Sequence, residues 1–394
     1  MYLGRLGARR QTGFQLDSPE GLQRLRALCG GESVPAVPHG DTVADYLASV
    51  DPADVQRICQ QMVRALLESR RLEGFRLLDR WYLVAVDLSG HLYLGNTRSA
   101  FTEGCLTMTA EDGRTLYYRP VCEAKLITRT GLALSLGSEF LENPSKGRGH
   151  ACPQDSELPA AGRLIPRVKE AFPGYSFCAL LDGRYANETG FALCQAQGWR
   201  FIITLQQGSL PTVWQESQTL RRLAPENRLI VETESHQYHY TWANGIATDH
   251  RRVNVLECVR TSSTGQTNSF AWVTDIEITR KTADAIGQEG GIKRWKIENE
   301  GFRTQKHAGF EMEHAYAKRP QTAKNFYLVL QIAHMLSQML EVYCRGKAAV
   351  KKAFGSLRNL ARAWLEAFRR DPIPDPESLK RFLDERIQIR FNTS

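Results

Sequence analysis

The sequence predicts an α/β fold in which helices flank a mixed sheet. Two apolar runs of strand length, residues 81–86 and 177–181, are each followed by an aspartate, and such runs indicate strands covered on both faces. A helix pattern (188–196) and another strand pattern (199–205) follow the second run. This strand–helix–strand order implies a parallel pair of strands. The 394 residues are enough for two or three domains.

Residues 1–78 are expected to form a helical N-terminal region. Ser18-Pro19-Glu20 is a helix start, with Ser18 as N-cap and Pro19 at the first helical position, and this helix ends near Gly30. Further helices begin near residues 41 and 51. Several arginines make this region basic. DNA-end binding is what the family resemblance described below implies for it, and a helical packing domain without DNA contact is the alternative.

Residues 79–225 are expected to form the first part of a sheet-centred core. The first strand ends at Asp87, and strand patterns at 115–128 and 132–140 complete three antiparallel strands. A helix at 158–172 follows, where Pro166 indicates a kink or a later start. The next strand ends at Asp182, the carboxyl end at which ligands gather in open α/β sheets.

Residues 226–280 return to strand patterns and predict a β-rich insertion, with Asn244-Gly245 as a hairpin turn. Residues 281–345 predict the rest of the core: a helix over 293–307 after a break at Gly290-Gly291, then a helix over 318–343. The second helix is apolar but contains His334 and several other polar residues, so it predicts a buried core helix with a core histidine and no membrane span. Residues 346–394 predict a basic helical C-terminal region.

The helix over 293–307 contains an arginine and a glutamate four residues apart, Arg294 and Glu298, which share a helix face. A surface ion pair is the ordinary interpretation of such spacing. Two upstream aspartates at strand ends favour a different one, in which Glu298 completes a carboxylate site. Trp295 is expected to pack into the core.

Asp87, Asp182 and Glu298, in this order, resemble the DDE transposases of bacterial insertion sequences, which have an RNase H-like catalytic core. The likeness is to the cut-and-paste group with a β-rich insertion before the glutamate. Residues 181–187 (Leu-Asp-Gly-Arg-Tyr-Ala-Asn) look like that family's second-aspartate motif, and residues 294–299 (Arg-Trp-Lys-Ile-Glu-Asn) look like its glutamate signature. The resemblance covers roughly residues 75–345.

This resemblance implies a two-metal DNA enzyme. Asp87, Asp182 and Glu298 would hold two Mg²⁺ or Mn²⁺ ions, with Asp87 bridging, because these ions prefer carboxylate oxygens. Arg294 and Lys306 would hold phosphates, and Arg303 and His307 would be further DNA contacts. The reaction would be strand cleavage and strand transfer at the terminal inverted repeats of an insertion sequence.

The resemblance also implies partners and a compartment. Double-stranded DNA, as terminal inverted repeats and as target, would be the substrate, bound by a homodimer in the bacterial cytoplasm at the nucleoid. Two other functions stay open: an RNase H-like endonuclease that cuts without joining, and an element-derived DNA-binding protein that no longer catalyses.

Three departures from the family pattern bear on activity. The family often has a tyrosine where this chain has Gly291 and a basic residue where it has Gln305, with Lys306 next to it. The Cys/His cluster that some relatives carry after the first aspartate is missing. The chain also begins abruptly, so we expect an upstream segment of relatives to be absent.

Charge and cysteine usage agree with these expectations. The net charge is +8, and residues 341–370 hold eight Lys or Arg, among them Lys351 and Lys352, against two acids. This stretch would suit phosphate contacts; a solvated helix face is the alternative. The nine cysteines include no C-x-x-C pair, which argues against a zinc ribbon, and reduced thiols are typical of a cytoplasmic protein. No apolar leader follows Met1.

Two other enzyme classes and two other acids are disfavoured. No glycine-rich phosphate loop stands where a dehydrogenase or a kinase needs one. Glu123 and Glu139 lie on predicted strands and could compete for a metal ion. They rank below the three acids above because neither ends an apolar run.

Overall fold

The computed structural model describes residues 17–29, 35–95, 104–143, 155–308, 310–314, 317, 319–343, 352–356, 359–360, 363 and 366–367. The chain divides into two compact units, each discontinuous in sequence. One, here called the core unit, consists of Gln60–Ser89, Pro120–Gly301 and Thr393–Ser394. The other, here called the terminal unit, consists of Met1–Cys59, Gly90–Arg119 and Phe302–Asn392.

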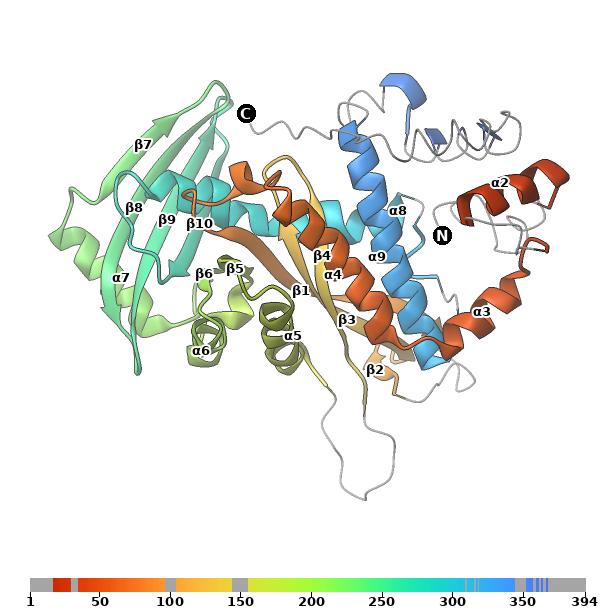
Figure 1. Cartoon of the computed structure of the whole chain (residues 1–394). Helices are drawn as coiled ribbons and strands as arrows, with labels where there is room; N and C mark the ends of the chain where they lie inside the picture. The colour runs from red at the N-terminus through yellow and green to blue at the C-terminus, as the bar shows by residue number, and fades with distance from the viewer. Residues whose placement is uncertain are drawn as a thin grey trace, which may run out of the picture. The chain divides into compact units, whose positions relative to one another are not determined.

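The core unit is built on a mixed sheet with the strand order β2-β3-β1-β5-β6-β10-β9-β8-β7, and β4 pairs with β3 off this path (Figure 1). β1 pairs in parallel with β5, and β5 with β6, whereas β3–β4, β6–β10 and the pairs from β10 to β7 are antiparallel. The predicted mixed sheet is therefore confirmed. The strands are β1 (Tyr82–Gly95), β3 (Thr115–Ile127), β4 (Ala133–Phe140), β5 (Phe177–Leu181), β6 (Arg200–Thr204), β7 (Arg228–Glu232), β8 (His236–Ala247), β9 (Arg252–Ser262) and β10 (Thr267–Thr274).

The first strand differs from its expected length. β1 does not end at Asp87 but continues to Gly95. Only its apolar first part pairs with β5, from Tyr82↔Phe177 to Ala85↔Leu180. The loss of apolar residues therefore marks the end of the parallel pairing and of two-sided burial, not the end of the strand.

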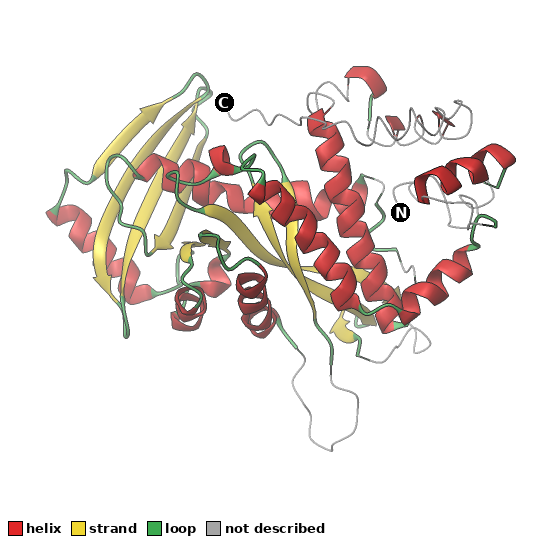
Figure 2. Cartoon of the chain, viewed as in Figure 1, coloured by secondary structure: helices red, strands yellow, loops and turns green. Residues whose placement is uncertain are grey.

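Helices α5 (Glu157–Ala171) and α6 (Glu188–Ala196) lie on one face of this sheet, as Figure 2 shows. α5 packs closely on β4, since a Cβ at Gly137 would lie 3.1 Å from the side chains of both Leu164 and Val168. α5 also runs unbroken through Pro166, so the later start suggested by that proline is wrong. A further helix, α7 (Pro211–Leu223), which the sequence patterns did not predict, contacts β8 and β9 through Arg221.

An irregular helical segment covers part of the opposite face. It consists of the π-helix η5 (Ala285–Gly290), the 3-10 helix η6 (Gly291–Arg294) and the start of the π-helix η7 (Ile297–Arg303). The chain then continues into the terminal unit with α8 (Thr304–His307). Gly290 and Gly291 mark the junction of η5 and η6, where the sequence predicted a break, although helical turns continue on both sides. A Cβ at Gly291 would stand 2.3 Å from the Trp272 ring, and one at Gly290 would stand 2.5 Å from Ile202. These glycines let the helix backbone approach the sheet closely.

The β-rich insertion is present as β7 to β10, although one of its turns is not where the sequence placed it. Asn244-Gly245 lies inside β8, at a register shift between Ala243 and Ile246. Gly245 has a φ of +75°, which suits a bulge as well as a turn. The Asn244 side chain accepts from the amide of Ile278 and donates to its carbonyl, so it fixes this bulge to the chain after β10.

The terminal unit is mainly helical in its described part. It contains α2 (Pro19–Cys29), α3 (Gly40–Ser49), the first half of α4 (Pro52–Glu68), α8 and α9 (Pro320–Tyr343), together with the short strand β2 (Leu106–Thr109) paired with the start of β3. α9 is the predicted buried helix. Its His334 is a core histidine, as predicted, since its Nδ1 lies 3.0 Å from Gln305 Nε2. Among the described residues, no helix is both long and apolar enough to cross a membrane.

Candidate active site

Asp87 lies on β1, and Asp182 directly follows β5, the strand that pairs in parallel with β1. The printed register runs from Tyr82↔Phe177 to Ala85↔Leu180, so both aspartates come just after the last paired residues of their strands. Parallel strands end at the same side of a sheet. The two aspartates are therefore brought to the same end of this strand pair.

The local sequence fixes Asp182 at that end. β5 ends at Leu181, and Asp182 is the N-cap of the 3-10 turn η4 (Gly183–Tyr185). One Asp182 carboxylate oxygen accepts from the Arg184 amide at 2.9 Å. The Arg184 guanidinium approaches the other oxygen at 3.9 Å. Capping therefore holds the carboxylate without burying it, and 27% of the side chain remains exposed.

Arg294 joins the first aspartate to the glutamate. Its Nη2 lies 2.8 Å from Glu298 Oε1 and its Nη1 lies 3.7 Å from Asp87 Oδ2. The Arg294 side chain is only 9% exposed, whereas that of Glu298 is 36% exposed. The predicted spacing of four residues does produce an ion pair, and the pair is directed at Asp87 rather than lying on an open surface.

Trp295 does not occupy the core position that the sequence suggested. It is 51% exposed, and the Arg294 guanidinium stacks on its ring at 4.9 Å. Ile297 and Phe302 are the buried residues of this helix instead. The π-helical turns explain the difference, because they rotate side chains away from the face that a regular 3.6-residue period assigns.

Burial raises the pKa of Asp87 to about 7. Arg294 works in the opposite direction and lowers it, and the charges of Glu298 and Glu157 raise it further. A carboxyl group with such a pKa ionises reluctantly in the metal-free protein. A cation placed beside it would favour the ionised form.

Glu157 is an acid of this site that the sequence patterns did not single out. It is the first residue of α5 and is 7% exposed. Arg184 Nη1 lies 3.0 Å from its Oε2. Burial and the charge of Asp182 raise its pKa. Nothing in the one-dimensional pattern marks it, because a glutamate in the first turn of a helix is common.

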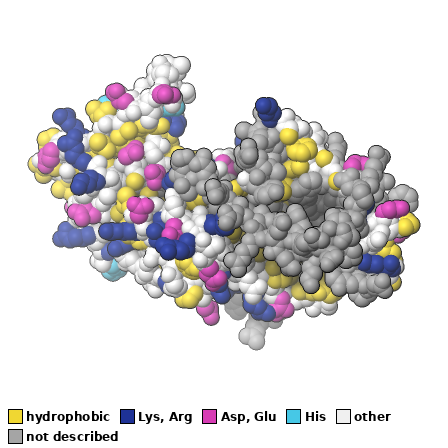
Figure 3. Space-filling model, turned by 45° about the horizontal axis from the view of Figure 1, so that its top comes forward, with side chains coloured by type: hydrophobic (Ala, Val, Ile, Leu, Met, Phe, Trp, Pro, Cys, Tyr) yellow, Lys and Arg dark blue, Asp and Glu magenta, His cyan; other side chains and the backbone are white. Residues whose placement is uncertain are grey.

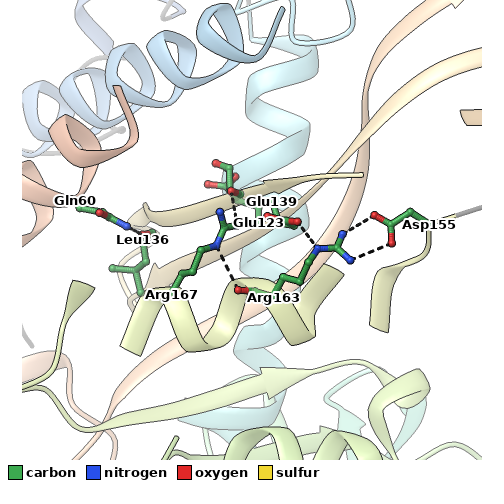
Figure 4. Close-up of polar contacts among 8 residues, drawn as sticks. Gln60, Glu123, Leu136, Glu139, Asp155, Arg163 and Arg167 are labelled. Carbon is green, nitrogen blue, oxygen red and sulfur yellow. Dashed lines mark hydrogen bonds and ion pairs between the residues drawn. The ribbon is translucent and has the colours of Figure 1, made fainter. Parts of the chain in front are cut away.

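Paired arginines fasten α5, and with it Glu157, to the sheet. Figure 4 shows Arg163 between Glu139 of β4 and Asp155, the latter just before α5, while Arg167 also reaches Glu139. Gln60 of α4 also contacts β4, where its side chain donates to the Leu136 carbonyl at 3.2 Å. Glu139 is therefore committed to two arginines and is a poor competitor for a metal ion.

Glu123, the other competing acid, is fully buried in a polar cluster of its own. Lys125 Nζ lies 3.3 Å from its Oε1, Ser138 donates to its Oε2 at 2.6 Å, and Ser135 donates to Oε1. A Cβ at Gly301 would lie 3.3 Å from the Lys125 side chain, so the helix that carries Glu298 packs directly on this cluster. Glu123 supports that helix rather than the site.

The donor set suits a hard divalent cation, but the carboxylates do not converge on one point. Among the described residues, no group of three or more His, Cys, Asp or Glu side chains stands close enough to hold a metal ion. Arginines stand between the acids instead. The oxygens of Asp87, Asp182, Glu157 and Glu298 are nonetheless the ligand type that Mg²⁺ and Mn²⁺ prefer.

Apart from Arg294, which belongs to the core unit, the residues predicted to contact DNA fall in the terminal unit. Arg303 and His307 are exposed, and Lys306 Nζ lies 2.8 Å from Glu313. Lys352 is exposed, whereas Lys351 and most of the basic stretch lie outside the described residues. Figure 3 shows Lys and Arg side chains at the end of the molecule that carries β7–β10 and α7, with acidic side chains interspersed among them. Because both signs of charge are mixed there, that face does not present an electrostatic field of a single sign.

Both departures from the family signature have structural reasons. Trp272 fills the space next to Gly291, so no larger side chain fits there. Gln305 is fully buried, and its Nε2 lies 2.7 Å from Gln331 Oε1 and 3.0 Å from His334. It therefore belongs to a polar network with α9 and does not reach solvent, where a phosphate-binding cation would have to be.

No family model matches the chain, and no curated protein matches it either.

Proposed function

We propose that the chain is a metal-dependent DNA nuclease and strand transferase of the DDE transposase type, with Asp87, Asp182 and Glu298 as its catalytic acids. One observation carries the proposal: Arg294 lies between Asp87 and Glu298, and Asp182 directly follows the strand that pairs in parallel with the strand of Asp87. This arrangement supports a common site for three acids that are far apart in the sequence. The carboxyl ends of parallel strands are where open α/β sheets bind ligands.

In this proposal each side chain has its own task. The carboxylates hold two Mg²⁺ or Mn²⁺ ions, which when bound would activate the attacking oxygen and stabilise the leaving oxygen of a displacement at phosphorus. Arg294 is buried and planar, so it keeps Glu298 in place and offers donors for a phosphate oxygen. The Asp182 cap bond keeps its second oxygen free of the backbone.

DNA outside the site would be held by Arg303, Lys306, His307, Lys351 and Lys352. The substrate would be the terminal inverted repeats of an insertion sequence together with target DNA, bound by a homodimer in the bacterial cytoplasm. The sparse basic side chains of the described surface suit weak, salt-dependent phosphate contacts. Specificity for DNA ends would have to come from elsewhere in the chain.

The test is Mn²⁺-dependent nicking of a supercoiled plasmid by the purified chain, followed by joining of a labelled 3′-hydroxyl oligonucleotide to the plasmid. Asp182→Asn and Glu298→Gln should reduce both activities to background. Asn still caps η4 and Gln still accepts from Arg294, so both variants should fold. A chain that both nicks the plasmid and joins the oligonucleotide is a strand transferase. A chain that nicks without joining is an endonuclease that only cuts.

Glu300→Gln is the matched control. Lys296 Nζ lies 3.2 Å from Glu300 Oε1, which is the same four-residue ion pair as Arg294–Glu298, two positions further along the same helix. Loss of an ion pair as such would affect both variants equally. Equal activity in Glu298→Gln and Glu300→Gln would refute the assignment of Glu298.

A DNA-binding protein without catalysis is the second candidate. It is favoured by the arginines that stand between the acids and by the absence of three converging carboxylates among the described residues. If it is correct, the chain retards DNA on a gel with a salt-dependent affinity, and nicking stays at background in Mn²⁺ for wild type and Asp182→Asn alike.

A further inference from the structure

The strand β7 ends the sheet and has one open side. It is the last strand of the sheet order, and among the described strands it pairs only with β8. Figure 1 shows it at the outer margin of the β-rich insertion. The pairing is regular from Arg228↔Thr241 to Glu232↔Gln237, without the register shift that occurs further along β8. A regular open edge of this kind can hydrogen-bond to another strand.

The hydrogen bonds between β7 and β8 decide which backbone groups of β7 face the open side. The Thr233 amide, one position past the strand, donates to the His236 carbonyl at 2.9 Å. Antiparallel strands alternate between pairs that are hydrogen-bonded to each other and pairs that are not. The backbone groups of Arg228, Ile230 and Glu232 therefore point away from β8, toward the open side.

The side chains of β7 do not protect this edge. Arg228, Ile230 and Glu232 share one face because they are two positions apart, and all three are exposed. Ile230 in the middle is 53% exposed. Natural proteins commonly blunt an open edge with a lysine, a proline or a β-bulge. The strand reads Arg-Leu-Ile-Val-Glu and has none of these, so it is suited to pairing with a further strand.

The open edge is complementary to itself in one register. If two copies of β7 run antiparallel about a two-fold axis at Ile230, the two Ile230 side chains lie opposite each other. Arg228 of each chain then lies opposite the partner's Glu232. Apolar pairs and opposite charges across two strands are both stabilising. A shift by two residues would place Ile230 opposite a charge, and a shift by four would place like charges opposite each other.

The same register also matches the outward backbone groups. The two Ile230 residues exchange amide–carbonyl bonds, and each Glu232 amide meets the partner's Arg228 carbonyl. The Arg228 amide is not needed, because it donates to the Glu226 carbonyl at 2.7 Å. Glu232 Oε1 accepts from Gln237 at 2.6 Å, which orients the carboxylate so that its Oε2 can meet the partner's arginine. Shifts by an odd number of residues would mismatch these backbone groups.

We propose that β7 is a dimer interface, at which a second copy of this chain continues the sheet antiparallel about a two-fold axis at Ile230. Backbone hydrogen bonds supply the affinity of such an added strand, and the side chains select its register. A second copy is the partner because each charged end of β7 finds its complement in the same five residues, as a two-fold interface requires. The inference goes beyond the proposed function, since the interface needs neither DNA nor a metal ion.

The test is the mass of the full chain in solution without DNA or metal, measured by sedimentation velocity over a range of concentrations. Wild type should form a dimer. Arg228→Glu and Glu232→Arg should each raise the dissociation constant of the dimer at least about tenfold, because two-fold symmetry repeats every like-charge contact. An equimolar mixture of the two variants should dimerise again, since a mixed dimer has opposite charges at both positions.

Ile230→Pro tests the backbone bonds of the interface separately. Because the Ile230 amide points away from β8, a proline there removes no bond of the β7–β8 ladder. The variant should keep the circular dichroism spectrum of wild type and lose the dimer.

Val259→Lys is the matched control for exposed apolar surface. Val259 of β9 is 40% exposed and lies in the same cross-strand row as Ile230, to which it is linked through His239. It stands two strands away from the open edge, so its replacement should leave the dimer unchanged. Loss of the dimer in Val259→Lys but not in Ile230→Pro would show association through the face of the sheet and would overturn the inference.

The remaining outcomes separate this interface from the proposed catalysis. If wild type stays monomeric at every concentration, or if the mixture of Arg228→Glu with Glu232→Arg stays monomeric, the β7 interface is refuted. Nicking of DNA by such a monomer would leave the catalytic acids in place. A wild-type dimer that the charge variants abolish and their mixture restores, but that nicks no DNA, would uphold the interface and refute the catalytic proposal.

Discussion

Replacing Asp87 with asparagine should make the metal-free protein more stable at pH 8 than the wild type. The substitution keeps the shape of the side chain but removes a charge that the fold disfavours. The pKa of Asp87 rises from 3.8 to about 7, chiefly through burial. At ~1.4 kcal/mol per pH unit, ionising this group in the folded protein costs up to about 4 kcal/mol.

Proton binding decides the sign of the stability difference between Asp87→Asn and the wild type. The folded protein binds the Asp87 proton more tightly than the unfolded chain does, so the associated stability is fully present below about pH 4 and is lost as the pH rises to about 7. Asparagine does not titrate. The stability of Asp87→Asn minus that of wild type should therefore increase between pH 4 and 7 and level off above. The carboxylate keeps 14% exposure, so we expect a plateau of ~2 kcal/mol rather than the full value.

The assay is urea unfolding in EDTA at pH 5, 6, 7 and 8, followed by tryptophan fluorescence. Asp112→Asn is the control, because Asp112 is exposed beside Arg114, which lowers its pKa. That variant should show no pH-dependent difference over this range. A difference between Asp87→Asn and wild type that stays constant with pH, or a variant less stable at pH 8, would refute the reasoning. In saturating Mn²⁺ the order should reverse, since a ligand stabilises only the form that binds it.

Three further predictions concern the packing around the site. Gly291→Ala should lose ~1–3 kcal/mol in urea unfolding, because its Cβ would meet Trp272 at 2.3 Å, and the loss should shrink in a double variant with Trp272→Ala. Lys125→Met should lose ~3–5 kcal/mol at neutral pH, because it removes the cation paired with the buried Glu123, and adding Glu123→Gln should recover most of it. Gln305→Lys, which introduces the cation of the family signature, should lower the melting temperature instead of raising DNA affinity, since position 305 is fully buried.

The strand-edge aspartates show how much of the site the sequence carries. An apolar run is needed to bury a strand on both faces, and the first carboxylate after it must lie where burial ends. The pattern alone could therefore place Asp87 and Asp182 where the buried parts of their strands end, although β1 itself continues to Gly95. It could not give the parallel pairing of β1 with β5, because each strand by itself is compatible with several alignments.

The helix around Glu298 shows the limit of periodicity. The four-residue spacing correctly predicted the Arg294–Glu298 pair, because it holds over a single turn of most helices. The prediction for Trp295 was wrong, because π-helical turns change the angular period over longer stretches. Gly290-Gly291 marks the predicted boundary, between η5 and η6, and also allows close packing of the helix on the sheet, which the sequence did not show. A glycine in a sequence indicates that the backbone is conformationally free at that position. Its neighbours in the folded structure decide whether this freedom allows a turn or a close contact.

The sequence by itself determined the class of fold, most of the order of its strands and helices, with α7 and β2 missed, and the three acids that a family resemblance brings together. These follow from local burial patterns and short-range spacing. Only the tertiary structure decided that Arg294 and Arg184 stand between the acids, that Trp272 excludes a side chain at position 291, and that Glu157 joins the site. These facts depend on contacts between residues tens to hundreds of positions apart, and such contacts leave no period in the sequence.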